Sequence, residues 1–408
     1  MSAFRIYETD TCVPRGPGPG PGPGPDPVFD WSPPDAEEFT GGIVRLSSDG
    51  KLAAVAYTAN DSVYVQSYVY NETQDSWSKR GAFLDALSEF EAKISGIPDV
   101  IDIVNNAGRV EFMTFDMDDG GDKIVLGIPK LKYNVLGSPT ITPEVGAVLA
   151  FEFGTSTSTW GGIEAVFDIN SANIGRAVSI SGDGSTVAFS INDQVKLYEF
   201  DVWDEKGTIQ PVLSLPTTVF IKLLTNYNGS VVLGLVPGLT NSVYRSFYSN
   251  SVGWSEFVNI VTIPTSPGDY IDITANSSCN VLGAFRSGVG VPQPVATCWI
   301  RDDPTGVYLP QGNPITANLT ETSNVSLNGD GNRFAIGTAS GTDVYELSVI
   351  YNALSEVLNG SPVSLVEWNK LGTTLGPGNA SVDISSDGDS LAVWKTGSDV
   401  STYKYVEQ

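Results

Sequence analysis

The side chains that most often do chemistry in proteins are scarce in this chain of 408 residues. The chain contains no histidine, which excludes Ser-His-Asp and Cys-His nucleophile systems, histidine-ligated metal sites and an imidazole pH switch. It also lacks a P-loop, a dinucleotide-binding fingerprint and a CxxC motif. Of the three cysteines, Cys279 and Cys298 could form a disulfide, but we expect two buried free thiols.

Carboxylates are the abundant reactive groups, with 47 Asp and Glu residues against 22 Lys and Arg. No pair among them can be singled out for glycosidase-type acid–base catalysis. The densest segment is FDMDDGGD, from Phe115 to Asp122. A hairpin turn is one explanation of its Asp-Gly pair, because Gly accepts a positive φ and Asp bonds its own backbone. Whether this segment is a hairpin turn or a ligand-binding loop therefore depends on the strands that flank it.

Those elements form a repeat in which an apolar strand, a Ser/Asn-Asp-Gly turn and a second apolar strand recur seven times. The spacing of about 40 to 70 residues is typical of propeller blades with loop insertions. The four clearest copies begin at Val44, Ala177, Asn324 and Ser381, and weaker copies begin near Val110, Val219 and Tyr270. A third strand rich in Val and Tyr, then usually a Trp, follows each hairpin. The sequence therefore predicts an all-β, seven-bladed β-propeller.

The last repeat ends at YKYVEQ, without the fourth strand that follows Trp77 or Trp368 in other repeats. A similar segment, PVFDWSPP around Trp31, lies near the other end of the chain. A propeller closed by a strand from the opposite terminus has no open sheet edge. We therefore predict that Val28–Trp31 supplies the missing outer strand. A short helix is also expected within Phe83–Asn105, where Leu84, Leu87, Phe90 and Ile94 have helical spacing.

The repeat S-x-D-G-x-x-L-A-V-G … V-Y … W resembles propellers built from FG-GAP or WD40-like units, and it covers nearly all of residues 28–408. In the second blade, IVLGIP and GAVLAFEF resemble the FG-GAP repeats of integrin-type propellers, whose loops bind calcium. That resemblance implies a calcium candidate at Asp116, Asp118 and Asp122, with Asp119 as a spare. The register departs from D-x-D-x-D-G, so a plain hairpin turn remains the alternative, and no other cofactor is expected.

Arginines near the starts of three successive first strands, Arg45, Arg109 and Arg176, could line the central channel as an anion-binding ring. Against this acidic background, however, we expect the three arginines to pair with local Asp and Glu residues. Arrays similar to this one occur in surface proteins of marine microbes and algae and in structural proteins of the large viruses that infect them. That resemblance implies a location on a virion or particle surface.

The charge balance limits the partners. A net charge of −25 and a pI near 4.2 repel phosphate backbones and anionic membrane surfaces, so nucleic-acid binding is not expected. The sequence shows no Sec signal peptide, and no run of 18 apolar residues could span a membrane.

The chain is predicted to have three parts: an N-terminal anchor or tail (1–14), a Gly-Pro linker (15–27) and the propeller (28–408). Phe4, Ile6 and Tyr7 make the first part more apolar than a disordered tail requires, so they are candidate partner-binding residues. We predict a non-enzymatic structural or recognition module, tethered by its N-terminal segment to a larger assembly. The alternatives are a lectin-like adhesin that binds a glycan or receptor on a propeller face, and a hydrolase with a carboxylate site in the channel.

Overall fold

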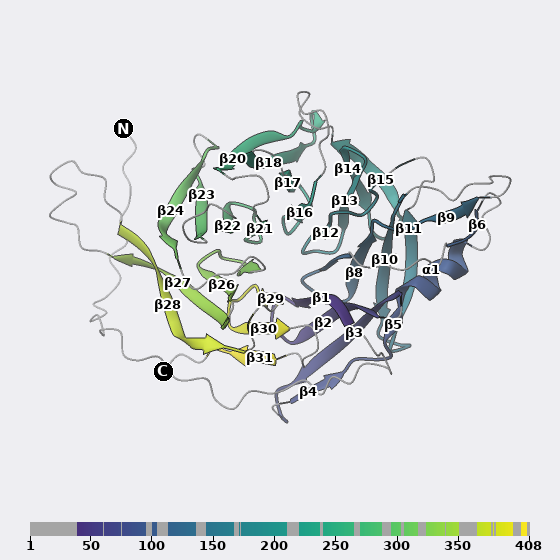
Figure 1. The fold of residues 1–408 in the computed structure, drawn as a ribbon, viewed down its shortest axis with the longest axis horizontal. Coiled ribbons are helices and arrows are strands. Elements are labelled where there is room, and N and C mark those ends of the chain that lie inside the picture. The colour runs from purple at the N-terminus through teal and green to yellow at the C-terminus, as the bar shows by residue number, and fades with distance from the viewer. Residues whose placement is uncertain are drawn as a thin grey trace.

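Seven β-sheets are arranged radially around a central axis in the computed structural model (Figure 1). The structure describes residues 39–59, 61–74, 76–94, 100–103, 113–135, 144–166, 171, 173–209, 220–236, 240–264, 270–287, 295–302, 306–316, 324–338, 340–350, 365–376, 378, 381–394 and 401–405. The predicted all-β, seven-bladed propeller is confirmed. Residues 1–38, which include Phe4, Ile6, Tyr7 and Trp31, lie outside the described residues.

The strands of each blade run in chain order from the channel outward. Blades one to three contain these strands: β1 (Phe39–Leu46), β2 (Leu52–Ala59), β3 (Ser62–Asn71), β4 (Ser76–Lys79) and the short β5 (Leu84–Asp85); β7 (Thr114–Met117), β8 (Lys123–Ile128), β10 (Ala147–Gly154) and β11 (Thr159–Val166); and β12 (Val178–Ile180), β13 (Thr186–Ile191), β14 (Gln194–Glu199) and β15 (Asp204–Ile209).

Blades four to seven contain these strands: β16 (Lys222–Thr225), β17 (Val231–Val236), β18 (Thr240–Ser249), β19 (Gly253–Trp254) and β20 (Val258–Pro264); β21 (Tyr270–Ala275), β22 (Val281–Ser287), β23 (Val295–Arg301) and β24 (Tyr308–Ile315); β25 (Val325–Leu327), β26 (Arg333–Thr338), β27 (Gly341–Ile350) and β28 (Leu365–Leu375); and β29 (Ser381–Ile384), β30 (Ser390–Trp394) and β31 (Ser401–Lys404).

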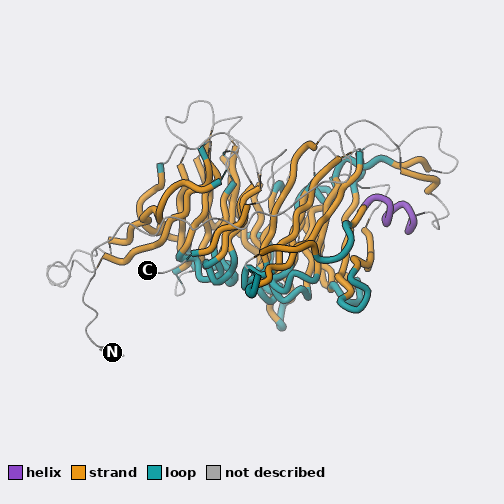
Figure 2. The backbone as a smooth tube through the Cα atoms, turned by 90° about the horizontal axis from the view of Figure 1, so that it is seen from below, coloured by secondary structure: helices purple, strands orange, loops and turns teal. Residues whose placement is uncertain are grey.

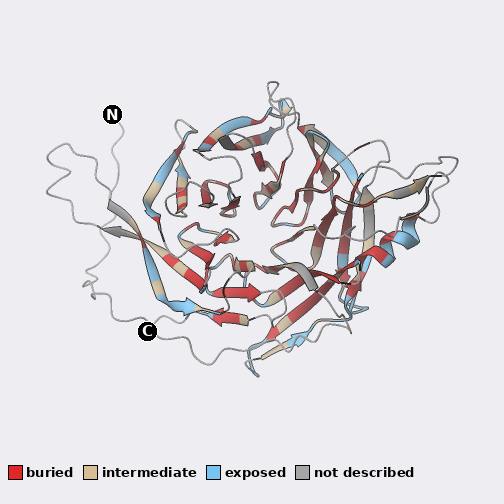
Figure 3. Ribbon diagram, in the orientation of Figure 1, coloured by how far each residue is buried: buried red, intermediate tan, exposed pale blue. Residues whose placement is uncertain are grey.

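The second strand of each blade forms the core, because neighbouring blades cover both of its faces. Its sequence is accordingly a near-continuous apolar run: all six residues of VVLGLV in β17 are buried, and SLAVW in β30 is buried throughout. Outer strands are more exposed, as in DEKGTI of β15 (Figure 3). The hydrophobic core therefore lies between blades and close to the channel.

The turn between the first and second strands has the same geometry in all seven blades. Its first residue is Ser, Asp or Asn, and the side chain of that residue accepts a hydrogen bond from the backbone N–H five residues later, at 2.8–2.9 Å. These first residues are Ser47, Asp118, Ser181, Asn226, Asn276, Asn328 and Ser385. The fourth residue has a positive φ and is Gly in six blades, but it is Cys279 (φ 56°) in blade five. The predicted Ser/Asn-Asp-Gly turns are confirmed, and Figure 2 shows them gathered on one face of the ring.

One insertion stands outside the propeller core. The predicted helix is confirmed as α1 (Ala86–Ile94), which buries Leu87, Phe90 and Ile94, whereas Leu84 precedes it in β5. The strands β6 (Val100–Ile103) and β9 (Tyr133–Val135) pair with each other beside it. Among the described residues, no helix is both long and apolar enough to cross a bilayer.

The seventh blade has three strands within the described part of the chain, whereas the other six have at least four. Its outermost described strand, β31, pairs with β30 on one side only. The segment predicted to complete it, Val28–Trp31, is outside the described residues. Closure by an N-terminal strand therefore stays a prediction.

Candidate functional site: the central channel

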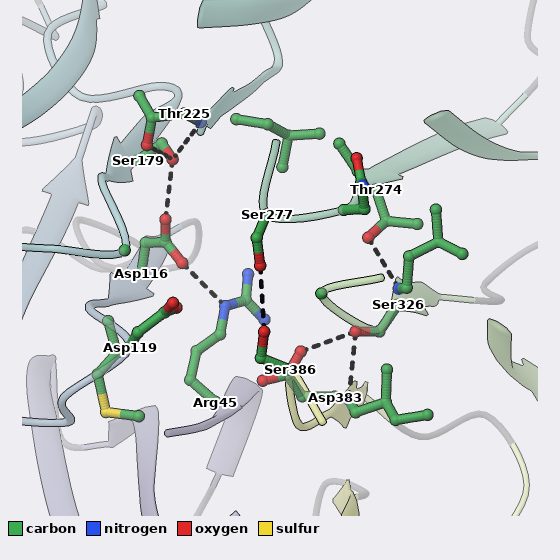
Figure 4. Close-up of a pocket in the computed structure, with 18 of the residues that line it drawn as sticks. Arg45, Asp116, Asp119, Ser179, Thr225, Thr274, Ser277, Ser326, Asp383 and Ser386 are labelled. Atoms are coloured by element: carbon green, nitrogen blue, oxygen red, sulfur yellow. Dashed lines mark hydrogen bonds and ion pairs between the residues drawn. The ribbon is translucent and has the colours of Figure 1, made fainter. Parts of the chain in front are cut away.

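The central channel is the candidate site because it holds a cavity of about 160 Å³ that every blade helps to line. Two layers of residues form it: side chains from the inner strands, and the turns that follow those strands (Figure 4). The charged side chains in the lining are Arg45, Asp116, Asp119, Lys222 and Asp383.

The turn layer is a closed ring of backbone hydrogen bonds. The second residue of each turn lines the cavity, and one N–H···O bond links each turn to the next. The seven bonds, of 2.7–3.2 Å, are Ser48 N to Asp119 O, Asp119 N to Gly182 O, Asp183 N to Tyr227 O, Tyr227 N to Ser277 O, Ser277 N to Gly329 O, Gly329 N to Ser386 O, and Asp387 N to Ser48 O. Because the bonds are made by backbone atoms, the side chains at this level are not needed to make them.

The inner-strand layer is joined by side chains. At five junctions, a residue two positions before the turn accepts a hydrogen bond from a backbone N–H of the next blade, at 2.8–3.2 Å. The acceptors and donors are Asp116 with Ile180 N, Ser179 with Thr225 N, Thr274 with Leu327 N, Ser326 with Ile384 N, and Asp383 with Leu46 N. Short polar residues therefore occur at this position because they satisfy buried donors of the neighbouring strand.

The two remaining junctions use a cation. Arg45 of β1 has no acceptor to offer, and its Nε donates to Asp116 Oδ1 of β7 at 3.1 Å. In blade four the equivalent position is Leu224, and there Lys222 Nζ donates to Asp272 Oδ1 of β21 at 2.6 Å. Both cations thus connect one blade to the next.

Burial and neighbouring charges shift the pKa values of several groups. Burial would lower the pKa of Arg45, but the carboxylates of Asp383 and Asp116 outweigh it and raise that pKa above its usual value. Burial raises the pKa of Asp383, although Arg45 and the hydrogen bond from Leu46 oppose the shift. The pKa of Asp119 is raised to about 6, first by burial and then by the carboxylates of Asp118 and Asp116.

The three aspartates of the calcium candidate lie near one another in the chain but bond to different groups. Asp116 lines the channel, where it accepts from Arg45 and Ser179. Asp118 is the first residue of its turn and accepts from the backbone N–H groups of residues 122 and 123. Asp122 forms an ion pair with Arg80. Within the described ranges, no group of three carboxylate, thiol or imidazole residues is arranged to hold a metal ion.

The three arginines proposed as a ring are not assembled by the described residues. Arg45 lines the channel, Arg176 is described but is not among the lining residues, and Arg109 is outside the described residues. The second cation of the channel is instead Lys222.

Cys279 and Cys298 are both buried and free, as expected. Burial raises the pKa of Cys279 to about 12 and that of Cys298 higher still, so both stay protonated and unreactive at neutral pH.

Sequence reasoning missed Lys222, Asp272 and Asp383, and it assigned Asp119 only a spare role. A signal existed: the position two residues before each turn is polar within strands that are otherwise apolar, as at Asp116, Ser179 and Ser326. Aligning the seven turns would have identified this position and the cavity-lining second residue of each turn.

The comparisons with known proteins concern the fold. No model of a protein family matches the sequence, and no curated protein matches it. Solved structures do match, in 1196 chains. One is a chain of the "Crystal Structure of Mitotic Checkpoint Complex", with a TM-score of 0.52 and 12% identity over 100% of this chain and 99% of that chain.

The protein is thus a seven-bladed β-propeller. At 12% identity the likeness is one of fold alone. It does not extend to the FG-GAP type, nor to a marine or viral setting.

Proposed function

We propose that this chain is a non-enzymatic recognition module whose turn face binds a partner protein. The observation that carries the proposal is the ring of seven backbone hydrogen bonds between turns. It holds the second residue of each turn in place while leaving its side chain free to differ: Ser48, Asp119, Gly182, Tyr227, Ser277, Gly329 and Ser386. A rigid frame that presents different side chains is the usual architecture of a binding surface.

Three carboxylates of the inner strands are engaged between blades, which supports a role without catalysis for Asp116, Asp272 and Asp383. Asp116 and Asp383 each accept hydrogen bonds from a neighbouring blade, and Asp272 accepts from Lys222 and from Val325 N. A general acid or nucleophile must exchange its partners during a reaction, whereas these groups join blades.

We further propose that the first 14 residues tether the propeller to a larger assembly, such as a particle or virion surface. The basis is the sequence alone: an apolar set, Phe4, Ile6 and Tyr7, followed by a Gly-Pro spacer. An extended spacer of this length would separate the anchor from the propeller by about 30–40 Å.

Two experiments test the proposal. Deleting residues 1–14 should leave the melting temperature unchanged and abolish co-purification with the assembly; the matched control replaces Phe4, Ile6 and Tyr7 by Ser at full length. Normal assembly of both variants would refute the tether.

A glycan array and a glycoside-hydrolysis panel address the alternatives. Specific glycan binding would favour the adhesin, and turnover that is lost in Asp116→Asn would favour the hydrolase.

A further inference from the structure

The turns of blades two, three and four bring a carboxylate, a glycine and an aromatic ring together at the channel mouth: Asp119, Gly182 and Tyr227. A Cβ atom built on Gly182 would stand 2.7 Å from Asp119 Oδ2 and 2.7 Å from Tyr227 Cδ2. The carboxylate of blade two and the aromatic ring of blade four therefore lie on the same side of Gly182, close to each other. The absence of a side chain at residue 182 is what leaves room for them.

Asp119 has no partner for its charge among the described residues. Of the other charged groups in the lining, Arg45 is paired with Asp116, Lys222 with Asp272, and Asp383 accepts from Leu46 N and Ser326 Oγ. Asp119 uses its backbone N and O in the turn ring, but its carboxylate has no hydrogen bond or ion pair in the part of the chain that the structure describes (Figure 4).

The surroundings of Asp119 favour a positive charge. The carboxylates of Asp118, Asp116, Asp383 and Asp183 all raise its pKa, after burial. The two cations of the cavity lining are occupied, Arg45 by Asp116 and Lys222 by Asp272. The carboxylates around Asp119 would attract a further cation to this position.

Tyr227 adds a surface for a flat cation. The residue is 54% exposed, although it belongs to a turn that lines the cavity. An aromatic face attracts a cation and packs best against the planar guanidinium of arginine. The hydroxyls of Ser48, Ser277 and Ser386 occupy the same level of the ring and can accept hydrogen bonds from guanidinium N–H groups.

We propose that the channel mouth binds the guanidinium group of an arginine from a partner protein, with its charge on Asp119 and its face on the ring of Tyr227. The inference rests on the proposed function and specifies the chemistry of the partner. Asp119 is the charged anchor and Tyr227 the stacking surface, and Gly182 is the residue that lets the two side chains come together, because it places no side chain between them.

The probe is a short peptide, acetylated and amidated, with one central arginine. The control peptide carries citrulline, which has the same shape without the charge. By calorimetry at pH 7.5, the arginine peptide should bind at least tenfold more tightly than the citrulline peptide. Because the pKa of Asp119 is about 6, its carboxylate becomes protonated between pH 7.5 and pH 5, and the affinity for the arginine peptide should fall over that range.

Substitutions test the role of each residue in binding the arginine peptide. Asp119→Asn should lower affinity about tenfold and abolish its pH dependence, since the charged form of Asp119 is the anchor. Tyr227→Leu should weaken binding several-fold, whereas Tyr227→Phe keeps the aromatic face and should retain it. Gly182→Ala places a methyl group 2.7 Å from Asp119 Oδ2 and Tyr227 Cδ2, so both side chains must move apart and binding should be lost; the backbone itself is not strained, because Gly182 does not have a positive φ. Melting curves identify any variant that fails to fold.

Equal affinity for the arginine and citrulline peptides, or full binding by folded Asp119→Asn, would overturn the inference. The proposed function is tested separately, by capture of the partner assembly. Capture that is unaffected by Asp119→Asn and Tyr227→Leu would leave the recognition role standing and reject this site.

Discussion

Asp116 should be a structural residue, and its substitution gives the sharpest test of how the blades are joined. Its carboxylate accepts from Arg45 Nε at 3.1 Å, Ser179 Oγ at 2.9 Å and Ile180 N at 3.0 Å, so it joins blades one, two and three. Asp116→Ala removes these bonds and leaves Arg45 with its bond to Val44 O and the nearby charge of Asp383. We expect a loss of about 3 kcal/mol in the free energy of unfolding, because removing one partner of a buried ion pair costs about 3–5 kcal/mol and this pair is partly exposed.

This loss of unfolding free energy corresponds to a measurable shift in melting temperature. With an unfolding entropy of about 2 cal/mol/K per residue over roughly 370 residues, 3 kcal/mol lowers the melting temperature by about 4 °C. Asp116→Asn keeps one carbonyl acceptor and should lose about half as much. Asp122→Ala is the matched control: its side chain is 45% exposed in an ion pair with Arg80, so solvent screening should limit the loss to under about 1 kcal/mol.

Scanning calorimetry of the three variants, at one scan rate and with and without calcium, provides the measurement. The reasoning fails if Asp122→Ala destabilises as much as Asp116→Ala. It also fails if each variant loses the same calcium-dependent stabilisation, because the aspartates would then act together as metal ligands.

Three further predictions follow from the structure and the sequence. A chelator should leave the melting temperature nearly unchanged, because Asp116, Asp118 and Asp122 are each bonded to protein groups; a drop of several degrees would contradict this. The folded-state pKa of Asp119, about 6, exceeds its unfolded value, so its stabilising contribution is complete below about pH 4 and is lost as pH rises through 6. Asp119→Asn should therefore melt above the parent at pH 7.5 and level with it near pH 4, and a variant that melts lower at pH 7.5 would refute the assignment. Cutting the chain after Glu38 removes the segment predicted to complete blade seven, so the truncated protein should melt earlier and aggregate, whereas unchanged stability would show that the segment is not part of the ring.

The blade count could be predicted because its signal is local. A turn that begins with Ser, Asn or Asp and has Gly at its fourth position depends on four consecutive residues, and six copies can be recognised without any knowledge of contacts; the seventh copy has Cys279 in place of Gly. The same chemistry explains Asp118, whose side chain bonds its own turn as the hairpin alternative required. The helix α1 was predictable for a similar reason, since its buried residues repeat at helical spacing.

The contacts within the channel could not be predicted in this way. Asp383 and Leu46 are bonded at 2.8 Å but are separated by 337 residues, and nothing near either residue indicates the other. Asp116 illustrates the consequence: its neighbours in the sequence suggested a metal loop, whereas its partners in space are Arg45 and Ser179. Cys279 is a further case, because its positive φ follows from its place in the turn rather than from its residue type.

The junction between blades seven and one differs from the other six in how it can open. At every other junction the chain itself connects the two blades, so a broken contact can re-form locally. Among the described residues, the seventh junction is held by non-covalent bonds: Asp387 N to Ser48 O, Leu46 N to Asp383, and Val44 N to Ser381 Oγ. Closing a loop of more than 300 residues costs about 5 kcal/mol of chain entropy. In the protein cut after Glu38, in which no chain segment crosses this seam, the seam should therefore form last in folding and open first under thermal stress, and a disulfide engineered across it should slow unfolding of the whole ring.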